Sequence, residues 1–297
     1  MLHPFSAVTP AKVNLGLEVL GRRSDGFHEI RTILQTVSIY DRFVLTPEEL
    51  PFQYLSPLGI APESDLVARA LASADSTADW TGSLTLEKHI PEAAGLGGGS
   101  SDAAFALTLA HPDWLTERIR ARAGALGSDV PFFVNGGTAL ATGTGTDLLP
   151  LPTPALWFVI LVPDFAIPSK TRTLYAALTE KDFSDGEQVD ALADSIRNDA
   201  PLQGPFPNAF ERALLDYQAI AQTRSALRDA GADNVSVSGA GPALFTVTKR
   251  YLDAASILRR LRPESGRAFV ARATMADGRQ ETAHQLARLI RGGHSVR

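Results

Sequence analysis

The residues best suited to chemistry lie in one glycine-rich stretch, Pro91-Glu-Ala-Ala-Gly-Leu-Gly-Gly-Gly-Ser-Ser-Asp-Ala-Ala104. A strand-like run from Leu84 to Lys88 precedes this stretch, and a helix-like run from Phe105 to Ala110 follows it. Glycines let backbone N–H groups approach an anion closely, and the dipole at the N-terminus of a helix attracts negative charge. The order strand, glycine loop, helix therefore predicts a site for phosphate or for a nucleotide.

The spacing of these glycines excludes two common phosphate motifs. A P-loop requires a lysine directly after its last glycine, and the dinucleotide fingerprint requires a third glycine where Ser100 stands. We expect Ser100 or Ser101 to cap the helix, with Asp102 in its first turn. The alternative is a flexible loop between two elements. Four glycines in five positions, followed at once by serines and a helix, favour anion binding without specifying the reaction.

A second group of polar residues lies on a strand near the N-terminus. From Lys12 to Val19 apolar residues alternate with polar or small ones, which predicts a half-buried strand with Lys12 and Asn14 on one face. A lysine at a strand start is usually solvated. A lysine that shares a face with an asparagine near a phosphate loop is a candidate ligand. From the residues alone, the two interpretations are equally supported.

The stretch Gly21-Arg-Arg-Ser-Asp-Gly-Phe-His28 has the glycine, serine and aspartate residues of a turn between strands. In a binding site, Arg22 and Arg23 would meet phosphate, while Phe27 and His28 would stack on a base. The alternative is a solvated hairpin tip with an aromatic ring folded onto it. Taken by itself, the stretch favours the hairpin tip.

Asp129 lies in a Gly-Ser-Asp turn directly before an apolar segment. An aspartate in a turn most often accepts hydrogen bonds from nearby backbone N–H groups. Pro131 follows it closely, and proline is common at the start of a helix. The local pattern therefore favours a helix cap.

Length and composition limit the class of protein. The 297 residues suggest two domains, and 44% hydrophobic with 21% charged residues is ordinary for a soluble globular protein. The net charge of −5 argues against a general nucleic-acid binder. The absence of cysteine excludes disulfides and thiolate sites. The N-terminus lacks a signal-peptide pattern, and no apolar run is long enough to span a bilayer.

A proline cluster formed by Pro150, Pro152 and Pro154 marks the predicted boundary between a domain of residues 1–154 and one of residues 155–297. The second part alternates strands with helices, which predicts an α+β sandwich with helices on one face of a mostly antiparallel sheet. In it we expect strands over 156–162 and 269–273, a strand–turn–strand unit over 234–247, and helices over 170–178, 190–197, 209–230, 252–261 and 281–290.

Three stretches in a fixed order resemble the GHMP kinase superfamily, named after galactokinase, homoserine kinase, mevalonate kinase and phosphomevalonate kinase. They are Pro10-Ala-Lys-Val-Asn-Leu15 with Arg22-x-x-Asp-Gly-Phe-His28, the glycine stretch, and Val237-Ser-Gly-Ala-Gly-Pro242. The first of them, with Gly127-Ser-Asp-Val-Pro-Phe-Phe133, is similar to the members that phosphorylate the 2-hydroxyl of 4-diphosphocytidyl-2-C-methyl-D-erythritol. Those members serve the methylerythritol phosphate route to isoprenoids.

The resemblance implies an α+β fold with an N-terminal domain like ribosomal protein S5 domain 2 and a ferredoxin-like C-terminal domain. It implies ATP and Mg²⁺ as cofactors, with metal ligands not assigned beyond the nearby candidates Ser101 and Asp102. It implies that Lys12 and Asp129 are catalytic. The implied ATP-binding residues are Pro91, Glu92, Ala93, Ala94, Gly95, Leu96, Gly97, Gly98, Gly99, Ser100 and Ser101. The implied substrate-binding residues are Asn14, Phe27, His28, Phe206, Gly239 and Gly241.

The sequence departs from the family at three points. Phe27 stands where many members have tyrosine, and Asp102 replaces the asparagine of some members. The glutamate that often follows the second Gly-x-Gly motif is absent, although Asp147 lies one residue away. Phe27 retains the ability to stack but cannot donate a hydroxyl hydrogen bond.

The expected ligands are ATP and a cytidine diphosphate alcohol, with no nucleic-acid or membrane partner. We expect a cytoplasmic monomer or weak homodimer. One alternative is another small-molecule kinase of the superfamily, against which the loop from Arg22 to His28 argues. The other is a non-catalytic nucleotide-binding or sugar-sensing relative, against which the presence of both Lys12 and Asp129 argues.

Overall fold

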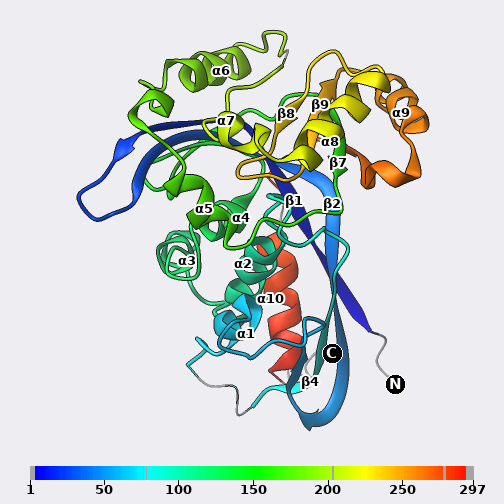
Figure 1. Cartoon of the computed structure of the whole chain (residues 1–297). Coiled ribbons are helices and arrows are strands. Elements are labelled where there is room, and N and C mark those ends of the chain that lie inside the picture. Colours follow the sequence, from blue (N-terminus) through cyan, green and yellow to red (C-terminus); the bar gives the residue numbers. More distant parts are fainter. Residues whose placement is uncertain (1–3, 76, 78, 203, 277–278, 292–297) are drawn as a thin grey trace.

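Two long antiparallel strands, β1 (Phe5–Arg22) and β2 (His28–Pro51), run through both halves of the molecule (Figure 1). The computed structural model describes residues 4–75, 77, 79–202, 204–276 and 279–291. β2 also pairs with β4 (Thr81–Glu87) and with β5 (Thr138–Thr142) along different parts of its length. β3 (Gln53–Leu55) and β6 (Asp147–Leu151) complete this sheet, in the order β3-β4-β2-β5-β6. One strand, β2, thereby connects all parts of the first sheet.

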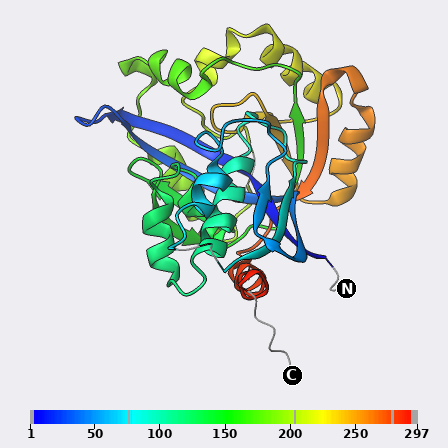
Figure 2. The same cartoon turned by 90° about the horizontal axis from the view of Figure 1, so that it is seen from below.

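Helices cover one face of the first sheet (Figures 1 and 2). They are α1 (Leu66–Leu71), α2 (Gly98–Ala110), α3 (Thr116–Ala123), α4 (Val130–Asn135) and α10 (Arg279–Ile290). Their apolar side chains form one buried cluster with those of β2 and β4. α10 comes from the end of the chain, so the last helix packs on the first half. The domain boundary at residue 154 stays a prediction.

The second half contains a four-stranded sheet in the order β10-β7-β9-β8, in which every pairing is antiparallel. Its strands are β7 (Trp157–Val162), β8 (Ser236–Val237), β9 (Leu244–Thr248) and β10 (Arg267–Arg272). Its helices are α5 (Lys170–Ala176), η1 (Glu180–Asp182), α6 (Glu187–Arg197), α7 (Glu211–Leu215), α8 (Gln218–Asp229), α9 (Tyr251–Arg260) and η2 (Pro263–Ser265). The predicted α+β class is confirmed.

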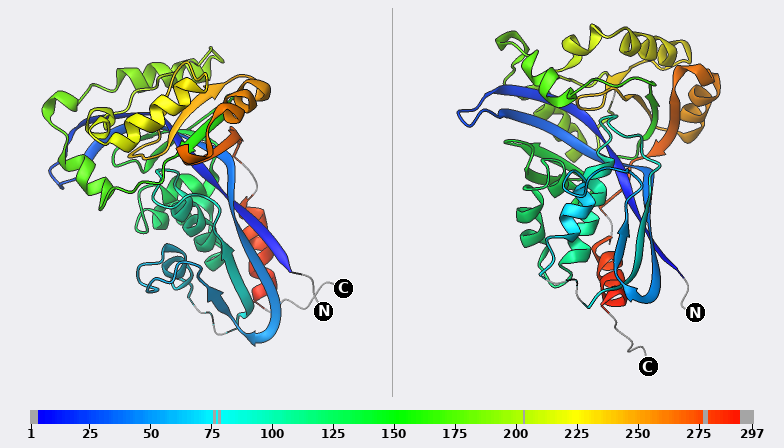
Figure 3. Two further views of the ribbon diagram at one scale, coloured as in Figure 1. Left: turned by 45° about the vertical axis from the view of Figure 1, so that its right-hand side comes forward. Right: turned by 60° about the horizontal axis from the view of Figure 1, so that its bottom comes forward.

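A shared hydrophobic core joins the two halves. Val13 and Leu15 of β1 pack in one buried cluster with Phe158 and Phe245 of the second sheet. Figure 3 shows β1 and β2 crossing between the helices of the first half and the second sheet. The prediction of a half-buried strand is therefore wrong, because β1 is buried from Ala11 to Val19. Its apolar face packs on the second half, and the glycine loop lies against its polar residues.

The predicted helix over residues 209–230 is two helices, α7 and α8. Tyr217, the residue before α8, has an extended backbone with φ −93° and ψ 115°. Its ring packs against Phe165, with the ring centroids 5.5 Å apart. A tertiary contact thus interrupts a segment whose local composition is helical throughout.

Candidate active site

Helix α2 begins directly in the glycine loop. Its N-cap is Gly97, whose φ of 72° is left-handed, and no side chain caps the helix. The predicted cap by Ser100 or Ser101 is wrong, because the helix begins at Gly98 and both serines lie in its first turn. The first N–H groups of a helix have no partner within the helix. Here they are left for an anion at the positive end of the helix dipole.

Glycine is required at two positions of the loop because neighbouring side chains or backbone atoms pack closely against each of them. A Cβ atom on Gly97 would lie 2.9 Å from Cγ of Lys12 and 2.9 Å from the ring of Phe133. A Cβ atom on Gly95 would lie 2.5 Å from the carbonyl oxygen of Ser238. Both residues also have positive φ angles, which side chains disfavour. The loop therefore rests directly on β1 and on the segment after β8.

Lys12 and Asp129 meet beside this loop. Nζ of Lys12 lies 3.4 Å from Oδ2 of Asp129 and donates to Oδ1 of Asn14 at 2.7 Å. The side chain of Lys12 is 5% exposed, whereas that of Asp129 is 36% exposed. A small molecule can therefore reach the carboxylate, while the lysine is held in place from behind. The backbone N–H of Lys12 also donates to the carbonyl of Leu96, which ties β1 to the loop.

The local pattern around Asp129 favours a helix cap, and the structure shows otherwise. Asp129 precedes α4, and Pro131 occupies its first turn. The carboxylate nevertheless makes no capping hydrogen bond and faces Lys12 instead. Because the ion pair links residues far apart in sequence, the local turn pattern could not reveal it.

The segment after β8 forms hydrogen bonds with both the glycine loop and β1. Oγ of Ser238 donates to the carbonyl of Gly95 at 3.0 Å and accepts from the backbone N–H of Asn14 at 3.3 Å. A Cβ atom on Gly239 would lie 2.7 Å from Oδ1 of Asn14. Nδ2 of Asn208 donates to the carbonyl of Gly239 at 2.9 Å. Asn14 and Gly239 are therefore in contact, whereas Gly241 lies on the other side of the turn, with its carbonyl facing Gly95.

A cavity of about 340 Å³ follows the glycine loop. It is lined by the loop from Pro91 to Ser100, with the exception of Leu96, and by Asp65, Lys88 and Asp102. Leu96 and Ser101 do not line it, because Leu96 packs in the shared core and Ser101 is buried in α2. A larger cavity of about 640 Å³ lies in the second half, between β9 and α9, and contains none of the predicted site residues. We assign the site to the smaller cavity because it contains the uncapped start of α2, whose backbone N–H groups can bind an anion.

A buried charge cluster anchors the start of α2. Lys88 donates to the carboxylates of Asp102, at 2.7 Å, and of Asp41. Oγ1 of Thr9 donates to the other oxygen of Asp102 at 2.5 Å. Burial raises the pKa of Asp102 to about 7, and repulsion by Asp41 acts in the same direction, while Lys88 opposes it. Burial lowers the pKa of Lys88, but the two carboxylates outweigh it and the net shift is upward.

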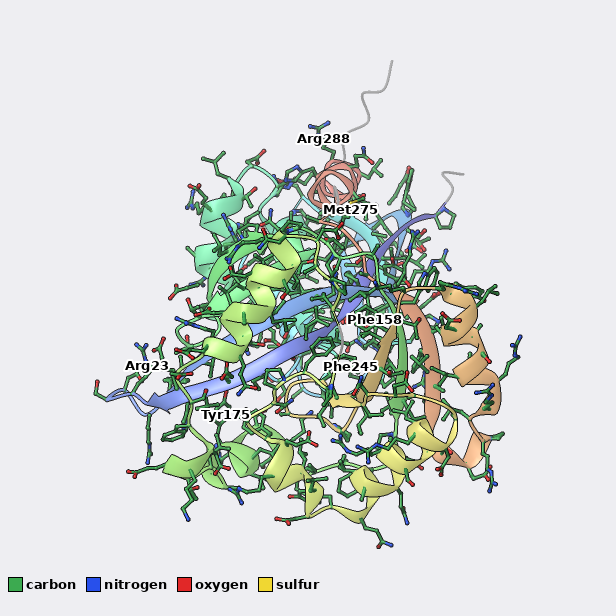
Figure 4. The ribbon with its side chains drawn as sticks, turned by 90° about the horizontal axis from the view of Figure 1, so that it is seen from above. Arg23, Phe158, Tyr175, Phe245, Met275 and Arg288 are labelled. Atoms are coloured by element: carbon green, nitrogen blue, oxygen red, sulfur yellow. The ribbon has the colours of Figure 1, made fainter. Side chains whose placement is uncertain are left out.

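An aromatic group surrounds His28, the first residue of β2. Figure 4 shows Tyr175, a member of this group, beside the two long strands. The ring of His28 stacks on that of Tyr175, with the ring centroids 4.6 Å apart, and Phe183 meets it edge-on at 6.2 Å. Phe27 is 64% exposed. Burial lowers the pKa of His28, and Arg22 adds to this, so the imidazole is neutral at pH 7. Burial, with Asp129 nearby, raises the pKa of Tyr175 to about 12.

Phe206 does not belong to this aromatic group. It is 7% exposed and stacks on Phe245 in the shared core, with the ring centroids 6.0 Å apart. A ring that is 7% exposed and belongs to the core is not accessible to a base. The prediction that Phe206 stacks on the substrate is therefore corrected, and Tyr175 is the second aromatic ring beside His28.

Sequence reasoning missed three residues of the site. Tyr175 and Lys170 both lie in α5, which the sequence indicates only as a helix. Nζ of Lys170 donates to the carbonyl of Ala93 at 2.6 Å and also to that of Gly241. Ser238 lies inside the third glycine motif, so its position next to Gly239 could have identified it as a site residue from the sequence.

Comparisons with known proteins identify the family of this chain. The model of the GHMP kinases N terminal domain matches residues 65–137, and that of the GHMP kinases C terminal matches residues 188–268. A 4-diphosphocytidyl-2-C-methyl-D-erythritol kinase of Symbiobacterium thermophilum is 38% identical over 275 residues, which covers 88% of this chain and 97% of that protein. The chain belongs to the GHMP kinase family. A Thermus thermophilus protein of the same name is 37% identical, covering 80% of this kinase and 86% of the relative.

Solved structures agree with the family. A crystal structure of 4-(cytidine 5'-diphospho)-2C-methyl-D-erythritol kinase matches with a TM-score of 0.77 at 33% identity, covering 92% of this kinase and 100% of that chain. A homoserine kinase from Cytophaga hutchinsonii matches with a TM-score of 0.65 at 18% identity, which shows the shared fold alone. Within the described part of the chain, no helix is both long and apolar enough to cross a membrane.

Proposed function

We propose that this kinase transfers the γ-phosphoryl group of ATP to the 2-hydroxyl of 4-diphosphocytidyl-2-C-methyl-D-erythritol. The observation that carries the proposal is the pairing of Lys12 with Asp129, 3.4 Å apart beside the glycine loop. Relatives that match nearly their whole length to this chain are named for this substrate. The reaction belongs to the methylerythritol phosphate route to isoprenoid precursors.

The pair can carry out the acceptor chemistry. A tertiary alcohol is a poor nucleophile, and phosphoryl transfer depends mainly on positioning and on charge stabilisation. Asp129, which is open to solvent, accepts the proton of the hydroxyl as the new phosphorus–oxygen bond forms. The bond between the γ-phosphorus and the bridging oxygen breaks, and ADP leaves. Lys12 orients the alcohol and offsets the negative charge that develops.

The glycine loop provides the ATP site in this proposal. The triphosphate lies against the uncapped start of α2, where backbone N–H groups and the helix dipole stabilise it. The cavity from Pro91 to Ser100 continues past Asp65 and Leu66 of α1, which leaves room for the nucleoside. Leu96 and Ser101 support this wall from behind.

Mg²⁺ belongs to the same proposal. Among the residues that the structure describes, no group of three histidine, aspartate or glutamate side chains could hold a metal. Both oxygens of Asp102 are already used by Thr9 and Lys88, while Oγ of Ser101 is buried without a partner in the described structure. Because Ser101 lies behind the cavity wall, this donor set would fit an ion held mainly by triphosphate oxygens and water. When bound, Mg²⁺ neutralises charge on the phosphates.

The cytosine ring of the acceptor would lie at the aromatic group formed by Phe27, His28 and Tyr175. The exposed ring of Phe27 is free to stack on a base. The neutral imidazole of His28, held by Tyr175, can exchange hydrogen bonds with the edge of the base. Asn14, which accepts a hydrogen bond from Lys12, would contact the erythritol end of the acceptor.

A substrate panel tests the proposal. The purified protein is incubated with ATP, Mg²⁺ and one acceptor at a time: the cytidine diphosphate alcohol, homoserine or mevalonate. Phosphorylation of the cytidine compound alone is the expected result. Turnover of homoserine or mevalonate without turnover of the cytidine compound would contradict the assigned substrate, and transfer to none of them would contradict a catalytic role.

A further inference from the structure

Lys170 brings a positive charge from the second half of the chain to the glycine loop. It is the first residue of α5. Its Nζ donates to the carbonyl of Ala93 in the loop at 2.6 Å, and to the carbonyl of Gly241 in the third glycine motif. These two carbonyls come from segments that flank the start of the phosphate site. The ammonium group therefore lies between two of the motifs that define the family.

Among the residues that the structure describes, Lys170 forms no ion pair of its own. The charged groups that face it from other elements are Lys12 of β1 and Asp129 before α4. Burial lowers the pKa of Lys170 to about 8, repulsion by Lys12 adds to this, and attraction by Asp129 opposes it. Asp129 forms its ion pair with Lys12. Both bonds of Lys170 go to neutral carbonyl groups, which stabilise an ammonium less than a phosphate does.

The glycine loop itself carries no lysine after its last glycine, unlike a P-loop. A γ-phosphate that reaches an acceptor between Lys12 and Asp129 must pass close to the ammonium of Lys170. We infer that Lys170 binds the γ-phosphate of ATP and takes the place of the lysine that the loop lacks. The contacts with Ala93 and Gly241 hold its side chain ready before ATP arrives. The inference rests on the proposed function for the position of the acceptor.

The experiment measures nucleotide binding, without acceptor or turnover, by titration calorimetry. The ligands are the β,γ-imido analogue of ATP and ADP, each with Mg²⁺, at pH 7 and pH 9. The variants are Lys170→Met and Lys170→Arg, with Lys249→Met as the control because Lys249 is an exposed lysine lining the other large cavity. Thermal unfolding of each variant separates lost binding from lost folding.

We expect Lys170→Met to weaken binding of the ATP analogue by about ten- to a hundredfold at pH 7, the effect of removing a charged hydrogen bond, with a much smaller effect on ADP. The wild type should lose affinity for the analogue between pH 7 and pH 9, because the free lysine loses its proton. This loss should be absent in Lys170→Met and reduced in Lys170→Arg, whose guanidinium stays charged. Asp102 and the nucleotide titrate near pH 7, so the signal is the difference between wild type and variant.

Three results would overturn the inference. They are equal losses for the ATP analogue and ADP, a lower unfolding temperature with unchanged binding, and the same pH dependence in wild type and Lys170→Met. The second result would mean that Lys170 is only a structural link between the two halves. Absence of nucleotide binding by the wild type would overturn it as well. A binding result as expected, without phosphorylation of the cytidine alcohol, would contradict the proposed function and leave the role of Lys170 standing.

Discussion

Replacing Asp129 with asparagine removes the proposed proton acceptor while leaving the size of the side chain unchanged. Asp129 is 36% exposed, makes no capping bond and pairs with Lys12 at 3.4 Å. A partly exposed ion pair of this kind contributes less than about 1 kcal/mol to stability. Lys12 is 5% exposed and keeps only its hydrogen bond to the neutral amide of Asn14 at 2.7 Å, so part of the cost of an uncompensated buried charge is added. The free energy of unfolding should therefore fall by about 1 to 3 kcal/mol, between the values for an exposed and for a buried ion pair.

Catalysis should respond much more strongly. Loss of a positioned general base lowers kcat by about a hundredfold to ten-thousandfold. The measurement is steady-state phosphorylation of the cytidine alcohol with ATP and Mg²⁺, together with nucleotide binding by calorimetry and urea unfolding. We expect kcat to fall in this range while ATP affinity remains close to that of the wild type and the variant stays folded in the absence of urea. The matched control is Asp229→Asn, at the exposed end of α8, which should be unaffected.

Two outcomes would refute this reasoning. If Asp129→Asn retained kcat within about threefold of the wild type, the carboxylate would not be the base, because that loss is far below the range for general-base catalysis. If the variant lost several kcal/mol of stability, the carboxylate would have a structural role that its exposure does not indicate.

Three further predictions follow from the geometry. Gly97→Ala should abolish ATP binding measured by calorimetry, because the new Cβ would lie 2.9 Å from Cγ of Lys12 at a φ of +72°. Gly124→Ala is the control, because Gly124 lies outside the glycine loop, has a φ of −57° and would place its Cβ no closer than 4.0 Å to a neighbour. Equal losses of ATP binding in the two variants would contradict the steric argument. The pKa of Asp102 is raised to about 7 in the folded state from an ordinary value of 3.8. Between these pH values the folded protein therefore binds more protons than the unfolded chain. The stability that protonation of Asp102 contributes is lost as the pH rises toward 7. Urea unfolding of wild type and Asp102→Asn should show their stability difference shifting in favour of the variant from pH 4.5 to pH 7.5, and a constant difference would exclude the raised pKa. Tyr175→Ala should raise KM for the cytidine alcohol but not for ATP, because the ring of Tyr175 supports the base site. Tyr175→Phe should behave like the wild type, because it keeps the ring and loses only a neutral phenol group. An unchanged KM for the cytidine alcohol in Tyr175→Ala would show that the ring is not part of that site.

Local patterns predicted much of the fold correctly. The strand–turn–strand unit over residues 234–247 is β8 and β9, and the apolar run over 156–162 is β7. Both depend on short-range chemistry, namely β-branched and apolar residues interrupted by glycine. The split of residues 209–230 was not predictable in this way, because the ring of Tyr217 packs against Phe165, about fifty residues away.

The candidate site also contains residues that local patterns predicted and residues that only tertiary packing placed. The glycine loop was recognisable because four glycines permit backbone geometry that other residues disfavour, and that property is local. Phe206 was misassigned because an aromatic residue in a loop has the same local pattern whether its ring faces the core or solvent. Its burial against Phe245 depends on the packing of β1 over the second sheet.

The sequence by itself determined the family, the phosphate-binding loop and the identity of Lys12 and Asp129 as candidates. The glycine loop was visible because local backbone geometry requires glycine there, whereas the family and the two candidates followed from the resemblance of short motifs to the GHMP kinases. The tertiary structure alone decided that Asp129 faces Lys12 instead of capping α4, that Tyr175 lies on His28, and that Lys170 reaches the loop. Such contacts join segments far apart in sequence; Asn14 and Ser238, for example, are 224 residues apart. The contacts of Tyr175 and Lys170 form only when burial of the shared core brings the two halves together, whereas Lys12 and Asp129 meet within the first half.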